Sequence, residues 1–190
     1  MLRNDGGTFT DITATSGLGN DGWGTCAAVG DIDGDGWTDL YVVNYLHWSF
    51  DDPVPPPMSF MGAQVLAGPR GLKPQHDALY INNRDGTFRD VSQAWGLHDI
   101  EAVFGLNAVI TDFTGDGQQD ILVGNDTTAN RLLVRSSDPQ QPTIIDRGFA
   151  SGLSTNADGG EQATMGLAIG DTNGDGRPDV FSTNFSSDTN

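Results

Sequence analysis

Short apolar runs alternate along the whole chain with polar segments that are rich in glycine and aspartate. Runs of this length, bounded by turn-forming residues, predict β-strands, and no stretch carries the 3.6-residue period of an amphipathic helix. The strands recur in sets of four. The first strands of three sets cover residues 24–30, 105–111 and 165–170, and the second strands cover residues 40–44, 121–125 and 180–184.

The later strands of each set follow at matching positions. Third strands are expected at residues 78–82 and 131–135, and residues 1–4 resemble the third strand of an earlier set. Fourth strands are expected at residues 8–11, 87–90 and 144–146. Four-stranded sheets in series are the blades of a β-propeller, in which stacked sheets bury faces that no single sheet can bury. We therefore predict an all-β fold in which residues 1–190 form an arc of a larger β-propeller, with two full and two partial repeats. Alone, such an arc would expose sheet surface at both ends, which predicts association or poor solubility.

An insertion interrupts the first full repeat. Residues 51–73 are rich in proline and glycine, and they lengthen the interval between the first and second sets. Insertions within repeats emerge as loops on one face. Large apolar side chains occur in and beside this segment, namely Trp48, Phe50, Phe60 and Met61. They either pack on the propeller face or form a lid that contacts a ligand.

Three nearly identical nine-residue strings join the first strand of each set to the second. Each places oxygen-bearing side chains at positions 1, 3, 5 and 9, with glycine at position 6, and position 7 offers a backbone carbonyl. Hard cations such as Ca²⁺ take six to eight oxygen ligands, and glycine permits the sharp turn that wraps the ion. The candidate ligands are Asp31, Asp33, Asp35, Trp37 and Asp39 in loop one, Asp112, Thr114, Asp116, Gln118 and Asp120 in loop two, and Asp171, Asn173, Asp175, Arg177 and Asp179 in loop three. We expect up to three Ca²⁺ ions, one in each loop.

Other interpretations of the loops are weaker. An EF-hand requires a glutamate at position 12 and a following helix, but position 12 is Val42, Val123 or Ser182 and a strand follows. Mg²⁺ prefers few protein ligands, and transition metals prefer histidine or cysteine. The remaining alternative is a turn that binds no ion. Four carboxylates repel one another in loop one without a cation, so we expect loop one to bind most tightly and the ions to be structural.

Composition narrows the possible partners. The formal net charge is −17, and the acids comprise 24 aspartates and only two glutamates, Glu101 and Glu161. Short carboxylates held near the backbone are typical of turns and metal loops. With eight arginines, one lysine and no basic patch, nucleic acid is not expected as a partner.

No apolar run is long enough to cross a membrane, so no membrane insertion is expected, and no signal peptide is recognisable. The single cysteine, Cys26, lies in an apolar run and is expected to be a buried small hydrophobe.

The sequence offers no recognisable catalytic constellation. The three histidines, His47, His76 and His98, are scattered over different turns, and Glu161 has no identifiable second acid or base. Arg70 could hold an anionic ligand or form a salt bridge. We therefore expect a non-enzymatic binding module that presents loops to a protein or glycan. The alternatives are the propeller portion of a secreted or envelope enzyme whose catalytic residues lie elsewhere, and a purely structural assembly domain.

The repeats and their loops resemble the FG-GAP/VCBS repeats of integrin-like, calcium-binding propellers. Segments that resemble the cartilage-acidic-protein-like branch, whose members carry an ASPIC/UnbV domain, cover residues 68–72, 79–83, 85–88, 158–166 and 183–190. This resemblance implies a seven-bladed propeller in a secreted, periplasmic or other cell-envelope protein. It also implies calcium binding and adhesion-type interaction with an extracellular or envelope protein or glycan. The ASPIC/UnbV domain itself is absent from these residues.

Overall fold

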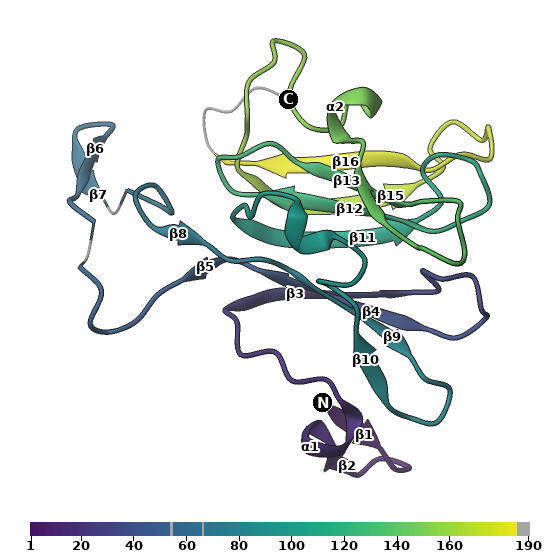
Figure 1. Ribbon diagram of the computed structural model, residues 1–190. Coiled ribbons are helices and arrows are strands. Elements are labelled where there is room, and N and C mark those ends of the chain that lie inside the picture. The colour runs from purple at the N-terminus through teal and green to yellow at the C-terminus, as the bar shows by residue number, and fades with distance from the viewer. Residues whose placement is uncertain (54, 66, 186–190) are drawn as a thin grey trace.

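Antiparallel strands build nearly all of the molecule. The computed structural model describes residues 1–53, 55–65 and 67–185. Two four-stranded sheets form its centre and shorter two-stranded ladders flank them (Figure 1). The predicted all-β class, as an arc of propeller blades, agrees with this arrangement. Residues 54 and 66 of the insertion lie outside the described part. So do residues 186–190, which belong to the segment 183–190 that resembles the cartilage-acidic-protein-like branch.

The two complete sheets contain the strands that the apolar runs predicted. Blade one contains β3 (Gly24–Gly30), β4 (Asp39–Asn44), β9 (Ala78–Asn82) and β10 (Phe88–Asp90), hydrogen-bonded in that order. Blade two contains β11 (Gly105–Thr111), β12 (Asp120–Asn125), β13 (Arg131–Arg135) and β14 (Ile144–Asp146) in the same order. On either side, β1 (Leu2–Asn4) pairs with β2 (Phe9–Asp11), and β15 (Thr164–Gly170) pairs with β16 (Asp179–Asn184).

The repeat extends to an irregularity of the backbone. The first strand of each set is called its inner strand. Near the start of each inner strand the register shifts, between Gly24 and Cys26 in β3, between Gly105 and Asn107 in β11, and between Thr164 and Gly166 in β15. A bulge of this kind bends a strand and increases its twist. Its recurrence shows that the three inner strands are structurally equivalent.

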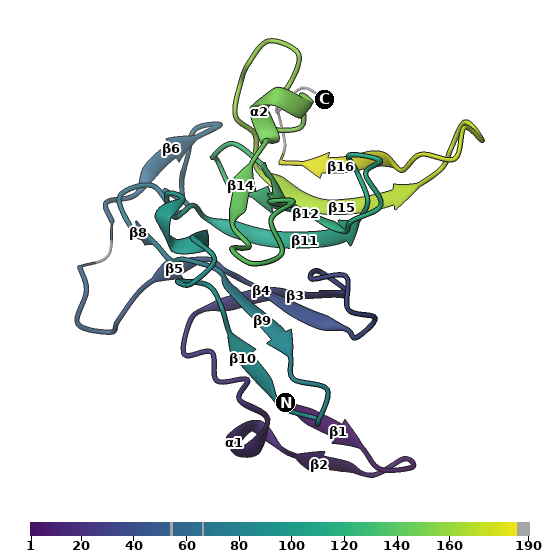
Figure 2. The same ribbon diagram turned by 45° about the vertical axis from the view of Figure 1, so that its right-hand side comes forward.

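The blades pack face to face, and the inner strands β3, β11 and β15 are neighbours (Figure 2). Tyr41 and Leu79 of blade one and Ile121 and Leu133 of blade two belong to one buried apolar cluster. A second cluster joins blade two to β15 and β16. The close approach depends on glycine, since a Cβ atom on Gly105 would lie 2.3 Å from Cγ1 of Val43. Apolar burial between the sheets therefore holds the arc together.

The insertion has more structure than its composition suggested. β5 (Leu46–His47), which precedes the insertion, pairs with β8 (Lys73–Pro74), which begins at its last residue. Within the insertion, β6 (Met58–Phe60) and β7 (Ala63–Val65) form a hairpin. The proline-rich composition predicted only a loop here. The strands were missed because three residues are too few to show an alternation of apolar and polar positions. The hairpin extends away from the blades at the left of Figure 1.

Single helical turns also occur, although the sequence shows no helical period. The short helices α1 (Thr13–Ser16) and α2 (Gly148–Ser151) and the 3₁₀ turn η1 (Leu97–Asp99) each follow the fourth strand of a set. One turn is too short to produce a periodic apolar face. No helix within the described ranges is long and apolar enough to span a bilayer.

Candidate metal-binding loops

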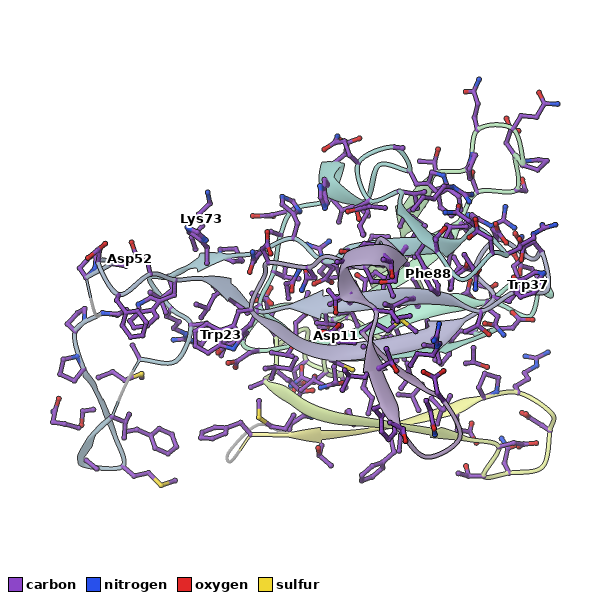
Figure 3. The ribbon with its side chains drawn as sticks, turned by 90° about the horizontal axis from the view of Figure 1, so that it is seen from below. Asp11, Trp23, Trp37, Asp52, Lys73 and Phe88 are labelled. Carbon is purple, nitrogen blue, oxygen red and sulfur yellow. The ribbon has the colours of Figure 1, made fainter. Side chains whose placement is uncertain are left out.

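The three aspartate-rich loops occupy the same place in three successive sheets. They connect β3 to β4, β11 to β12 and β15 to β16. All three therefore lie at one edge of the arc, on the right in Figure 1, and the insertion leaves from the opposite edge. Figure 3 shows Trp37 of loop one at one end of the molecule, with Trp23 and Lys73 toward the other. The three candidate metal-binding loops and the insertion therefore lie at opposite edges of the arc.

The first aspartate of each loop organises the turn. Asp31 accepts hydrogen bonds from the backbone N–H groups of residues 34, 35 and 36 at 2.9, 3.0 and 2.9 Å. Asp112 and Asp171 accept the corresponding three bonds in their loops at 2.6–3.2 Å. The glycines at positions 4 and 6 have φ between 75° and 87° in every loop. Residues with a Cβ atom are strained there, so both glycines are needed for this fold of the backbone.

The last aspartate of each loop closes the turn against the sheet. Asp39 is 1% exposed, and its Oδ2 accepts hydrogen bonds from the N–H groups of Ile32 at 2.8 Å and Asp33 at 3.3 Å. Asp120 is also 1% exposed and accepts the equivalent bonds from residues 113 and 114. Asp179 accepts one from the N–H group of Thr172 at 2.8 Å. Both ends of each loop are therefore fixed by its own carboxylates.

Loop one brings three of its predicted ligands together. Carboxylate oxygens of Asp31, Asp33 and Asp39 all lie within 4.8 Å of one another, a grouping of acids that no other set in the described ranges forms. Thr114 and Asn173 take the place of Asp33 in the other two loops, so each of those loops has one carboxylate fewer.

The fourth carboxylate of loop one is held elsewhere. Arg84, in the turn between β9 and β10, contacts Oδ2 of Asp35 through Nη2 at 2.7 Å and Nε at 2.8 Å. The other oxygen of Asp35 accepts the N–H group of Trp37 at 2.8 Å. Gln118 and Arg177 donate the matching bonds to Asp116 and Asp175. The seventh residue of each loop, predicted as a carbonyl ligand, is therefore also anchored through its N–H group.

The environment of loop one disfavours charge on two of its carboxylates. Burial raises the pKa of Asp39 above its ordinary value, although hydrogen bonds from the backbone N–H groups of Asn82 and Ile32 oppose the shift. Burial also raises the pKa of Asp33, and the negative charge of Asp35 adds to this effect. At Asp35 burial is outweighed by the hydrogen bonds from Trp37 and Arg84, so its pKa is lowered. A cation placed among Asp31, Asp33 and Asp39 would relieve the unfavourable charges.

Blade two supplies contacts to loop one that the sequence did not reveal. Arg135 of β13 donates to the carbonyl oxygens of Ile32 at 2.9 Å and Asp33 at 3.2 Å. Its Nη2 also donates to Oε1 of Gln118 at 2.6 Å, and Oε1 of Gln119 accepts the N–H group of Asp31 at 2.8 Å. These partners are remote from loop one in the chain. No local motif could have identified them.

Two histidines that the sequence treated as scattered lie together. The rings of His76 and His98 have centroids 4.8 Å apart, and Nε2 of His98 lies 3.1 Å from the carbonyl oxygen of Asp77. The pairing depends on how the insertion returns to β9, which sequence spacing does not show. Cys26 of β3 packs against the main core but is only half-buried, so it is less enclosed than the sequence predicted.

Comparison with known protein families agrees with the repeat geometry. The family model for the FG-GAP-like repeat matches residues 1–42, 65–123 and 112–182. No curated protein matches the chain. Together the matched segments contain all three acidic loops in full and most of the residues of the four-stranded sets. The chain therefore belongs to the FG-GAP-like repeat family.

Proposed function

We propose that this chain is a calcium-stabilised, non-enzymatic interaction module of the β-propeller type. The observation that carries the proposal is the cluster of carboxylate oxygens of Asp31, Asp33 and Asp39, held within 4.8 Å in a loop whose frame recurs twice. Oxygen ligands in a flexible loop suit Ca²⁺ better than Mg²⁺ or a transition metal. Residues of loops two and three supply the same type of oxygen donors, with Thr114 and Asn173 as neutral ligands.

Calcium has a structural role in this proposal. Each loop ends one strand and starts the next, so an ion at positions 1, 3, 5, 7 and 9 would fix the turn between them. Binding to the folded loop alone adds binding free energy to the stability of the sheet. In loop one the ion must attract Asp35 from Arg84, or bind without it.

The family supports an interaction role, because FG-GAP-like repeats in series suggest a β-propeller that serves as an interaction module. The resemblance to integrin-like and cartilage-acidic-protein-like propellers leads us to place the protein outside the cell or in the envelope. Its partner in this proposal is an extracellular or envelope protein or glycan. Binding of the chain to an array of extracellular glycans and matrix proteins, with and without Ca²⁺, tests that assignment, and no Ca²⁺-dependent binding would contradict it.

Calcium binding is tested by titration calorimetry and thermal unfolding of the 190-residue chain. We expect Ca²⁺ to bind and to raise the melting temperature by roughly 5 °C or more at saturation, with Mg²⁺ less effective. Asp33→Asn should weaken the tightest site, because it removes a clustered carboxylate. Asp51→Asn removes the same charge from the exposed insertion and serves as the matched control.

Two results would contradict the calcium proposal. One is an unchanged melting temperature when Ca²⁺ is removed with a chelator. The other is equal Ca²⁺ affinity in Asp33→Asn and the wild-type chain. Parallel titrations of Asp112→Asn and Asp171→Asn test whether loop one binds most tightly, and equal losses in all three variants would reject that ranking.

A further inference from the structure

A large cavity lies between the insertion and the edge of the blades that faces away from the acidic loops. Its volume is about 640 Å³, which is within the usual range for small-molecule sites. The β6–β7 hairpin and the segment after it form one wall, and residues beside β12, β15 and β16 form the other. Figure 3 shows the hairpin at the lower left, near the left-hand ends of the yellow strands β15 and β16.

Aromatic and thioether side chains line both walls of this cavity. Phe60 of the hairpin and Phe185 after β16 approach with ring centroids 5.9 Å apart. Met165 of β15 lies in the same lining and is 44% exposed, and Phe185 is 52% exposed. Such surfaces favour apolar groups, and aromatic faces also attract organic cations.

Among the described residues, three charged side chains line the cavity. Arg70 comes from the insertion, Glu161 precedes β15, and Asp126 follows β12. Within the described ranges Arg70 and Glu161 make no ion pair or side-chain hydrogen bond. Oδ2 of Asp126 accepts the hydroxyl of Tyr45 at 2.6 Å, which leaves its other oxygen free of described partners. The described lining thus has two carboxylates for one guanidinium.

We propose that this cavity binds an organic ammonium ion with an apolar body, with Glu161 as its charge partner. The ammonium group would meet the unpartnered carboxylate of Glu161, and the apolar body would pack against Phe60, Phe185 and Met165. The overall charge of −17 attracts cations and repels anions, so Arg70 alone does not make the cavity an anion site. The site is independent of the acidic loops, which lie at the other edge of the arc.

Three probes with one carbon skeleton test the proposal: 4-phenylbutylamine, 4-phenylbutan-1-ol and 4-phenylbutyrate. They share the phenylbutyl skeleton and differ in a terminal group that is cationic, neutral or anionic. Binding is followed at constant Ca²⁺ by NMR of ¹³C-labelled methionine methyl groups. Met58 and Met165 line the cavity, and Met1 serves as a remote internal reference. We expect the amine to shift Met58 and Met165 but not Met1, and to bind about fivefold more tightly than the alcohol, with the butyrate weakest.

Variants then identify the charge partner. Glu161→Gln should remove the advantage of the amine over the alcohol, and Arg70→Gln should leave it unchanged or increase it. Glu101→Gln removes the only other glutamate and is the matched control, since Glu101 does not line this cavity. Equal binding of the three probes, tighter binding of the butyrate, no methyl shift with any probe, or an unchanged preference in Glu161→Gln would each overturn the proposal. The methyl spectrum of each free variant verifies its fold.

Discussion

At the scale of single residues, Asp77 is a carboxylate in a place that disfavours its charge. Tyr41 donates its hydroxyl to Oδ2 at 2.6 Å, and the N–H group of Asn44 donates to Oδ1 at 2.7 Å. Burial raises the pKa of Asp77 to about 6, although both hydrogen bonds and the charges of Arg131 and His98 oppose the shift. The folded chain therefore binds this proton more tightly than the unfolded chain does.

This shift predicts a pH-dependent effect of Asp77→Asn. Because the folded pKa lies above the unfolded value, the stabilisation by the protonated form is present at low pH and is lost as pH rises from about 4 to about 6. Asparagine does not titrate, so the deficit of the variant relative to wild type should be larger at pH 5 than at pH 7.5. Its deficit should shrink by roughly 1 kcal/mol or more at pH 7.5. Urea unfolding of both proteins at the two pH values measures this, and a deficit that does not change with pH would refute it.

At the scale of elements, Arg135 ties β13 of blade two to the loop between β3 and β4 of blade one. Its guanidinium donates to the carbonyl oxygens of Ile32 and Asp33, which belong to loop one. Hydrogen bonds from a charged donor are stronger than neutral ones, and truncation leaves the half-buried carbonyls without this partner. The two blades thus share polar contacts as well as an apolar core.

Arg135→Gln should therefore destabilise the chain by about 1–3 kcal/mol in urea unfolding. It should also weaken Ca²⁺ binding at loop one more than at loop three, since the described hydrogen bonds of Arg135 reach loops one and two and not loop three. Arg147→Gln removes the same charge from an exposed position without a described side-chain partner and is the control. If the two variants unfold alike, Arg135 does not couple the blades.

The predictable part of the fold is the part encoded locally. The apolar runs at residues 40–44 and 121–125 predicted β4 and β12, because a short apolar run between two turns is enough to locate a strand. The acidic loops were predictable because each carboxylate binds the backbone of its own turn. Pairing over long distances was not predictable: Arg84 reaching Asp35, Arg135 reaching loop one, and Phe60 reaching Phe185 all depend on how sheets and insertion pack. The cavity depends on the same packing, so composition indicated only that apolar residues gather there.

At the scale of the whole molecule, edge exposure and net charge act in opposite directions. Among the described residues the last sheet has only β15 and β16, and Phe181 and Ile169 on these strands are 67% and 41% exposed. Unpaired edges and exposed apolar surface favour association, whereas the charge of −17 opposes it. Salt screens the repulsion but leaves the apolar term intact.

We therefore expect the 190-residue chain to form concentration-dependent oligomers that increase with salt. Sedimentation velocity at low and high NaCl measures this, in Ca²⁺ so that the loops are in one state. Phe181→Lys should reduce association, because it places a charge on the exposed sheet. Phe149→Lys makes the same change at a side chain that is 72% exposed on α2, away from the strand edges, and should have little effect. A chain that is monomeric in high salt, or equal loss of association in both variants, would show that the exposed sheet does not drive contact between copies.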